Sequence, residues 1–306
     1  MHQLRELVHR GGAKLSLARP RSAALSSTAA RHVVTARQAL SLSSAYAPAH
    51  PPAATLRVGA DKKRMLSLSP NITSLIIDIG ANTDPLLPRL EDTGRTLTLA
   101  FEPITYNAIK LAPGRLQVIH AAVSDRAGIA TMTLYNAQDR MQSSSLSSST
   151  TGLGSHGHQV VPTIPLAAVL DAVPPKVRIE LLKTDTQGHD FASLAATPAA
   201  SLRRAAFVKT EVWLGRQNYA GVRNDLCRDF LPLMRGHGYQ LQAVVRFDGS
   251  LVTRRGREEA FCADLGQRHG SGRPGSWTDE ADAYWQLEST SEPIPSVGWD
   301  FAPPTR

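Results

Sequence analysis

The feature that most constrains this chain is a set of short apolar runs that do not alternate with polar residues. Leu75-Ile76-Ile77 is apolar at every position, and the run from Ile179 to Leu182 is apolar except at Glu180. Strands of this kind suit a sheet that is buried on both faces, which requires parallel strands joined by helical crossovers. The sequence therefore predicts an α/β fold with a Rossmann-like, doubly wound, mostly parallel sheet.

The predicted elements divide the chain into three parts. A folded domain covers residues 65–265, a basic leader covers 1–64 and a Gly- and Pro-containing tail covers 266–306. We expect the three tail tryptophans, Trp277, Trp285 and Trp299, to pack on the domain surface. Strands are predicted near 75–80, 96–101, 116–121, 130–135, 160–164, 178–184, 206–213, 239–247 and 259–264, and helices near 85–91, 104–111, 165–171, 189–196 and 222–236.

The positive charge of the chain is concentrated in the leader. Residues 1–64 hold 11 of the 34 Lys and Arg and only two acids, whereas residues 65–306 carry a net charge of −1. A neutral domain gives no electrostatic reason to expect nucleic-acid binding. The leader has the cationic, acid-poor composition of a mitochondrial or plastid transit peptide, and a tail without a targeting role is the alternative.

Cysteine content and hydropathy exclude further classes. The only cysteines, Cys227 and Cys262, are too few for a disulfide framework or a Cys-rich zinc site, and we interpret them as buried, inert thiols. No stretch approaches the ~20 apolar residues of a membrane-spanning helix.

A candidate ligand site begins where the first strand ends. Asp78, Gly80 and Asn82 lie in the segment DIGAN at 78–82. In open α/β sheets, ligands bind beyond the carboxyl ends of the strands. A glycine there lets the backbone approach a ligand, and an acid beside it can accept hydrogen bonds.

Further candidates follow the next strands. Glu102, between an apolar strand and Pro103, is placed to accept both hydroxyls of a ribose. Ser124 and Asp125 follow another strand, where Asp125 can accept a hydrogen bond from an adenine amino group. Asp185 follows the strand near 178–184. The sequence predicts that these residues share one edge of the sheet.

Together, the segments resemble the FkbM-type family of S-adenosylmethionine-dependent methyltransferases, whose sheet is of the class I methyltransferase type. The resemblance covers residues 72–265. It rests on DIGAN at 78–82, FEP at 101–103, AAVSDRAG at 121–128, SSL at 144–146, VPTIPLAAVL at 161–170, LKTDTQGHD at 182–190 and TEVW at 210–213.

The resemblance implies S-adenosylmethionine as cofactor. Gly80 and Asn82 would lie by its methionine part with Asp78 beneath, Glu102 would hold the ribose, and Asp125, next to Ser124, would face the adenine. It also implies O-methylation of a hydroxyl on a small molecule or glycan. A hydroxyl acceptor is helped by a general base. Asp185 is the first candidate, ahead of His189 at the start of the following helix and His120.

Two features qualify this interpretation. Residues 136–159 form a long polar loop, interpreted as a lid on the substrate side. His156 and His158 lie in it without a nearby acid, so no metal is predicted.

Asp84 stands where the family usually has glycine; we expect it to cap a helix that starts at Pro85.

Asp84 keeps a degenerate, non-catalytic homologue open as an alternative. An NAD-dependent oxidoreductase ranks lower, because the segment after the first strand lacks the second and third glycines of G-x-G-x-x-G.

Overall fold

A computed structural model of the chain describes residues 54–58, 64–111, 116–135, 143–150, 154–215, 219–269, 280–292, 294–295 and 297–299. All of them belong to one compact unit, Val34–Arg306. The predicted leader falls outside the described residues except for 54–58 and 64. Among the described residues, no helix combines the length and apolarity needed to cross a membrane.

The strands are β1 (Ala54–Val58), β2 (Arg64–Leu68), β3 (Ser74–Ile79), β4 (Thr96–Phe101), β5 (Leu116–Ile119), β6 (Ala122–Ser124), β7 (Gly128–Tyr135), β8 (Ser155–Pro165), β9 (Arg178–Thr184), β10 (Phe207–Trp213), β11 (Tyr239–Arg246), β12 (Leu251–Arg254) and β13 (Glu280–Leu287). The helical segments are η2 (Leu90–Asp92), α2 (Thr105–Ala108), α3 (Leu166–Ala172), α4 (Asp190–Ala195), α5 (Ala199–Leu202), η4 (Leu226–Phe230), α6 (Leu231–Gly236) and α7 (Glu258–His269). The predicted strands 96–101 and 178–184 agree with β4 and β9 residue for residue.

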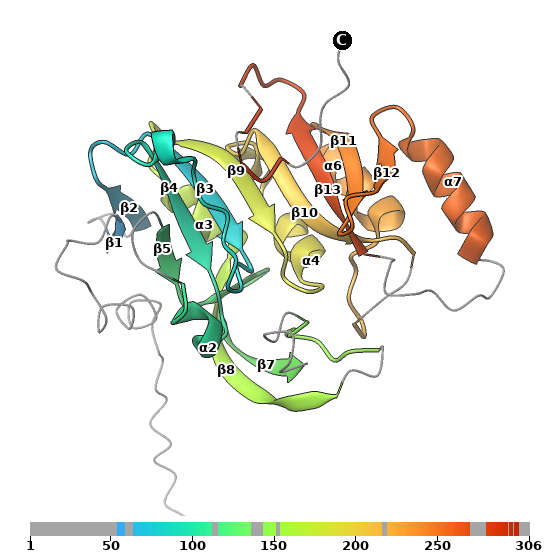
Figure 1. The fold of residues 1–306 in the computed structure, drawn as a ribbon, viewed down its shortest axis with the longest axis horizontal. Coiled ribbons are helices and arrows are strands. Elements are labelled where there is room, and N and C mark those ends of the chain that lie inside the picture. The colour runs from blue at the N-terminus through green and yellow to red at the C-terminus, as the bar shows by residue number, and fades with distance from the viewer. Residues whose placement is uncertain are drawn as a thin grey trace, which may run out of the picture. The chain divides into compact units, whose positions relative to one another are not determined.

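An eight-stranded mixed sheet forms the centre of the fold, in the order β12-β11-β13-β10-β9-β3-β4-β5 (Figure 1). The five strands from β10 to β5 are parallel, whereas β13 runs antiparallel to both β10 and β11. The chain goes from β3 outward to β4 and β5, and then returns to the other side of β3 with β9 and β10. Ligands of open α/β sheets bind at such a reversal. The chain after β5 forms a smaller, three-stranded sheet in the order β6-β8-β7.

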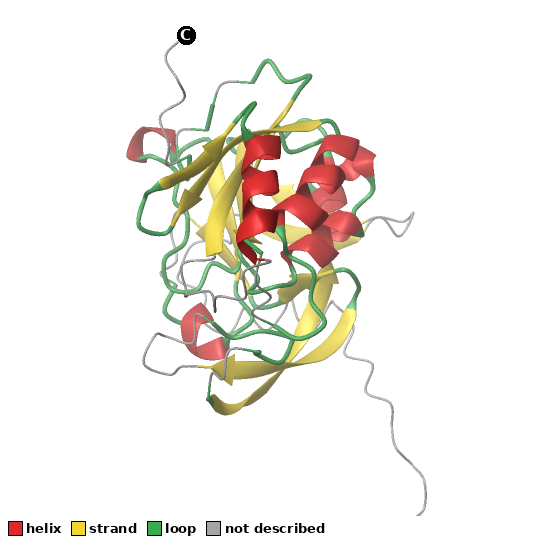
Figure 2. Cartoon of the chain, turned by 90° about the vertical axis from the view of Figure 1, so that its right-hand side faces the viewer, coloured by secondary structure: helices red, strands yellow, loops and turns green. Residues whose placement is uncertain are grey.

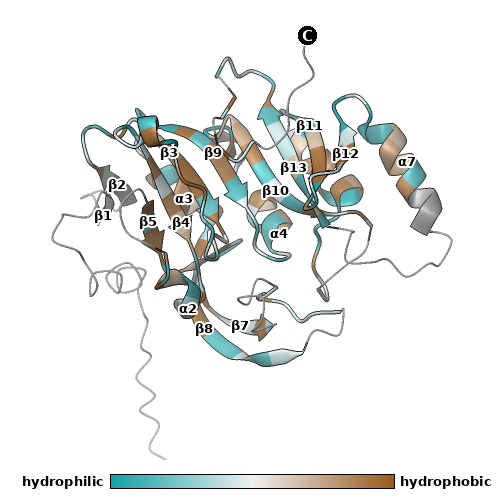
Figure 3. Ribbon diagram, in the orientation of Figure 1, coloured by the Kyte–Doolittle hydropathy of each residue, from teal (hydrophilic) through white to brown (hydrophobic). Residues whose placement is uncertain are grey.

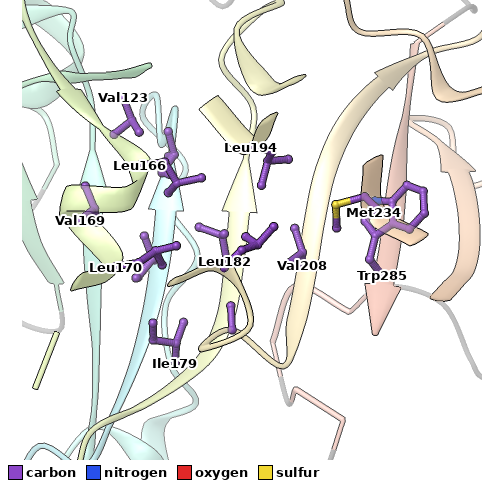
Figure 4. Packing of buried hydrophobic residues seen from close by; sticks show 14 of the residues in the cluster. Val123, Leu166, Val169, Leu170, Ile179, Leu182, Leu194, Val208, Met234 and Trp285 are labelled. Atoms are coloured by element: carbon purple, nitrogen blue, oxygen red, sulfur yellow. The ribbon is translucent and has the colours of Figure 1, made fainter. Parts of the chain in front are cut away.

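The core lies on the sheet face that the helices cover. Side chains of β3, β4, β9 and β10 form one buried cluster with residues of α3, α4, α5 and α6. Figure 4 shows Leu166 and Leu170 of α3 in this cluster with Leu182 of β9 and Val208 of β10. Most helical segments stand on one side of the sheet (Figure 2), and β5 is mainly hydrophobic (Figure 3). All six residues of β3 are buried, so burial on both faces of the sheet explains the apolar runs in the sequence.

The predicted helix at 85–91 is absent, so Asp84 caps no helix. The segment after the β3 turn is irregular until the short η2. The backbone N–H of Leu86 donates to Asp78 Oδ2 at 2.7 Å, and the Leu86 carbonyl accepts from Thr98 Oγ1 at 2.6 Å. Pro88 has no N–H to continue a helix. The side chain of Leu86 packs with Phe207 and Trp299 instead of forming a helical face, and Asp84 is exposed.

The last part of the predicted domain and the predicted tail also differ from expectation. Residues 258–269 form helix α7, not a strand, because Phe261, Cys262 and Leu265 have helical spacing and face the core. Within the predicted tail, β13 is an internal strand of the main sheet, and its Trp285 is fully buried. Trp299 packs edge-on against Phe207. Trp277 lies outside the described residues.

Two further predictions were wrong. Cys227 and Cys262 are not separate thiols but form a disulfide with an S–S distance of 1.98 Å, joining η4 to α7. Sequence alone could not show this pairing, because a disulfide requires the two Cα atoms to lie close together in space. The fold brings them to 5.7 Å. The predicted helix at 222–236 starts instead at η4, where Asp225 accepts hydrogen bonds from the N–H groups of Cys227 and Arg228.

Candidate active site

The turn after β3 is connected directly to the end of β4. Gly80 and Asn82 have positive φ angles of 77° and 49°. The N–H groups of Gly80 and Ala81 both donate to the Phe101 carbonyl, at 2.9 and 3.1 Å. The N–H of Asn82 donates to Glu102 Oε2 at 2.7 Å. The structure therefore brings the first two predicted strand ends together.

Glu102 is almost fully buried beside this turn, with 3% of its surface exposed. Its second oxygen, Oε1, accepts the N–H of Ile104 at 2.7 Å. Burial raises the pKa of this carboxyl to about 7, although the N–H groups of Ile104 and Asn82 and the charge of Lys183 act in the opposite direction. Each carboxylate oxygen has two acceptor sites, so Glu102 retains capacity for further donors.

The side chain of Asn82 also has unused hydrogen-bonding capacity. Its Oδ1 atom is buried and has no hydrogen-bond partner among the described residues. Because a buried acceptor without a donor is costly, an atom of this kind suits a ligand that donates a hydrogen bond.

Asp78 and Asp185 are joined by a lysine that sequence reasoning gave no role. Lys183 Nζ lies 3.1 Å from Asp78 Oδ1 and 3.7 Å from Asp185 Oδ2. It also donates to the carbonyl of Gly80 at 3.4 Å. Burial lowers the pKa of Lys183, but Asp78 and Asp185 outweigh this and raise it above its ordinary value. The lysine is therefore charged and fixes the ends of β3 and β9 relative to each other.

A third group of contacts involves Ser124, Asp125 and His189. Ser124 Oγ donates to Asp125 Oδ1 at 3.0 Å and lies 3.4 Å from His189 Nδ1. His189 Nε2 lies 3.0 Å from Ser147 Oγ. Burial lowers the pKa of His189, with Asp125 opposing, so the neutral imidazole is favoured at neutral pH. Asp125 thus lies beside His189, although Ser124 ends β6 of the smaller sheet and not a strand of the main sheet.

The predicted polar loop at 136–159 is shorter than expected. β8 starts at Ser155 and includes His156 and His158. Residues 143–150 pack onto the turn after β9: Ser145 Oγ donates to the Gln187 carbonyl at 2.7 Å, and Ser143 O accepts from Tyr219 Oη at 2.6 Å. Residues 136–142 and 151–153 lie outside the described residues. In the part of the chain that is described, no group of three or more His, Cys, Asp or Glu is arranged to hold a metal ion.

His120 makes local contacts. Its Nε2 lies 2.9 Å from the Pro103 carbonyl and 3.2 Å from Thr105 Oγ1. A carbonyl can only accept, so this nitrogen carries the proton. His120 therefore contacts the segment that follows β4, at Pro103 and Thr105.

Asp185 itself is partly exposed, with 32% of its side-chain surface accessible. Burial raises the pKa of this carboxyl, but Lys183, Glu211 and Gln187 together lower it below its ordinary value. It is therefore an ionised, accessible carboxylate at the carboxyl edge of the parallel strands.

The chain matches a model of a known protein family. A family model described as the methyltransferase FkbM domain matches residues 78–241, which is more than half of the chain. The matched range includes every predicted site residue from Asp78 to His189. No curated protein matches the chain closely enough to count as a relative.

Proposed function

This chain belongs to the FkbM methyltransferase family, and we propose that it transfers a methyl group from S-adenosylmethionine to a hydroxyl of a small molecule or glycan. The observation that carries the proposal is the contact between the first two strand ends, where Glu102 accepts the N–H of Asn82 at 2.7 Å. This contact places a carboxylate and a left-handed turn beside each other at the reversal of the sheet, where nucleotide ligands bind.

The fold that we propose is the Rossmann-like, doubly wound type of class I methyltransferases. The parallel strand order β5-β4-β3-β9-β10 and its reversal at β3 support this assignment. The irregular segment that replaces the predicted helix at 85–91 departs from a regular doubly wound arrangement.

The residues at this edge have the chemistry that the cofactor needs. Glu102 would accept the ribose hydroxyls with its remaining acceptor sites. Oδ1 of Asn82, which has no hydrogen-bond partner in the described part of the chain, would accept from the ammonium group of the methionine part. Gly80 would lie along that part, with Asp78 beneath. Ser124 and Asp125 would face the adenine.

The bound cofactor supplies an electrophilic methyl group on a sulfonium. Displacement at such a group is in line, so the protein mainly positions the acceptor. Asp185 would accept the proton of the acceptor hydroxyl, because it is ionised and partly exposed. His189, which favours the neutral imidazole, is the second candidate for this role.

Calorimetric titration of the full chain with S-adenosylmethionine and with NAD tests the cofactor. We expect binding of S-adenosylmethionine alone. The variant Glu102→Gln should bind it about 10- to 100-fold more weakly, because one of the two acceptor oxygens becomes an NH2 group that cannot accept from a ribose hydroxyl. Arg95→Gln, in the loop before β4, is the matched surface control. Binding of neither ligand would support a degenerate homologue, and binding of NAD would support an oxidoreductase.

The acceptor requires a separate search. Extracts incubated with the enzyme and isotope-labelled S-adenosylmethionine should contain a species that is heavier by one labelled methyl group. A labelled ether would establish a hydroxyl acceptor, whereas a labelled amine would contradict O-methylation.

We also propose that residues 1–64 direct the chain to an organelle, on the basis of their charge and composition. A fluorescent protein fused behind these residues should enter mitochondria or plastids. A fusion that stays diffuse in the cytosol would contradict this localisation.

A further inference from the structure

Gln187, in the turn after β9, has an unusual backbone conformation. Its φ angle is +54°, and Asn82 is the only other non-glycine residue of the described chain with a positive φ. This conformation is disfavoured for residues that carry a Cβ, so the surroundings must hold it. The Gln187 carbonyl accepts a hydrogen bond from Ser145 Oγ at 2.7 Å.

Every polar group of the Gln187 side chain has a partner. Nε2 donates to Asp185 Oδ1 at 3.0 Å and to Glu211 Oε2 at 2.6 Å. Oε1 lies 3.0 Å from Tyr219 Oη, whose single proton is shared between Gln187 and the Ser143 carbonyl, 2.6 Å away. An amide has two donor hydrogens, and both point at carboxyl oxygens. The opposite orientation would place Oε1 against the ionised Asp185 carboxylate, so the contact with Asp185 selects this orientation of the amide.

The Asp185 carboxylate is consequently held from two sides. Gln187 binds its Oδ1, and Lys183 lies 3.7 Å from its Oδ2. The two donors fix the rotation of the carboxylate while part of its surface stays exposed. A general base depends on such fixed geometry, because proton transfer needs hydrogen-bond reach to the acceptor.

Groups behind Gln187 make its position rigid. Glu211 is fully buried, and its other oxygen accepts from Trp213 Nε1 at 3.2 Å. The ring of Tyr219, which is 2% exposed, packs against Trp213 with 6.0 Å between the centroids. Buried side chains that satisfy one another in this way resist rotation.

We infer that Gln187 is a positioning residue, which orients the Asp185 carboxylate toward the methyl acceptor and is itself held by Glu211 and Tyr219. The inference rests on the role of Asp185 in the proposed function. It adds that buried side chains behind Asp185, Glu211 of β10 and Tyr219, fix the orientation of the proposed base through Gln187.

The charged groups around Asp185 support a measurable consequence. Burial raises its pKa, while Lys183, Glu211, Gln187 and the more distant Lys209 lower it. Burial and the neighbouring carboxylates Glu280, Asp185 and Asp190 raise the pKa of Glu211 well above its ordinary value. The Gln187 amide favours the ionised form of Asp185, so its removal should raise the pKa of Asp185.

The test is the pH titration of the Asp185 carboxyl by ¹³C NMR in the full chain, with the signal assigned through Asp185→Asn. Gln187→Met keeps the length of the side chain and removes the amide. We expect the pKa of Asp185 to rise by about one pH unit in this variant. Gln117→Met, on β5, is the matched control and should leave it unchanged. An unchanged Asp185 titration in Gln187→Met would overturn the inference.

A second variant keeps the test decisive if Gln187→Met does not fold. Tyr219→Phe removes the hydroxyl, which contacts both Gln187 Oε1 and the Ser143 carbonyl, and keeps the ring in its aromatic cluster. It should raise the Asp185 pKa in the same direction by a smaller amount, and no change would contradict the relay. The titration needs neither cofactor nor acceptor. Failure of the wild-type protein to bind S-adenosylmethionine would therefore contradict the proposed function without affecting this test.

Discussion

The ideal Cβ position of Gly80 lies 1.8 Å from the carbonyl oxygen of Asp185. No side chain fits at that distance, and the positive φ of Gly80 disfavours one as well. The turn after β3 and the turn after β9 therefore touch through their backbones. The sequence suggested that Gly80 leaves room for a ligand, whereas the structure shows that it first leaves room for the neighbouring strand end.

Gly80→Ala should destabilise the protein by about 3 kcal/mol, because the new methyl group displaces the Asp185 backbone and strains φ. The corresponding fall in melting temperature is about 10 °C. Gly94→Ala is the control, since a Cβ at Gly94 meets nothing within 4 Å. Equal melting temperatures for the two variants would contradict the backbone contact.

Lys183→Met should cost about 3 kcal/mol of unfolding free energy, because it leaves the fully buried Asp78 carboxylate without its cation. Urea unfolding measures the loss. Lys176→Met, which removes an exposed lysine, should change the stability by less than about 0.5 kcal/mol. A small effect at Lys183 would mean that the Leu86 N–H alone stabilises the Asp78 charge.

Glu102→Gln should flatten the pH dependence of stability between about pH 4.5 and pH 7. The folded carboxyl has a pKa of about 7, above the ordinary value of 4.5. Its contribution to stability is therefore present below pH 4.5 and is lost as the pH rises through about 7. The slope from this one group is at most about 1.4 kcal/mol per pH unit. Chemical unfolding at several pH values checks it, and identical slopes would argue against a raised pKa.

Asp185→Asn should lower kcat by about 100-fold once the acceptor is known, because the amide cannot take a proton. The affinity for S-adenosylmethionine should change little, since Asn82 and Glu102 remain in place. Asp171→Asn, at an exposed position of α3, is the control. Unchanged turnover would remove Asp185 as the base and favour His189.

Reduction of the Cys227–Cys262 disulfide should destabilise the protein by about 3 kcal/mol, because it frees a loop with a sequence separation of 35 residues. The oxidised, unfolded chain should show no reactive thiol, since both cysteines are paired. Two titratable thiols in untreated protein would contradict the bond, and melting with and without reductant measures its contribution.

Much of the sheet was predictable because its strands are locally distinct. β4 and β9 are apolar runs that end at acids, so local pattern and tertiary position agree there. β13 was missed because its alternating residues follow a Gly- and Pro-containing stretch, and only pairing with β10 and β11 makes it a strand. α7 was predicted as a strand because the apolar run from Ala260 to Ala263 is too short for its period to distinguish a strand from a helix.

The sequence by itself determined which residues stand at the strand ends: Asp78, Gly80, Glu102 and Asp185 each follow directly from a local run and its end. Only the tertiary structure decided which residues hold them, because Lys183, Gln187, Glu211 and Tyr219 acquire their partners across strands and loops. Hydrophobic periodicity is a property of neighbours in the chain, whereas a hydrogen bond or ion pair depends on distances that only packing sets.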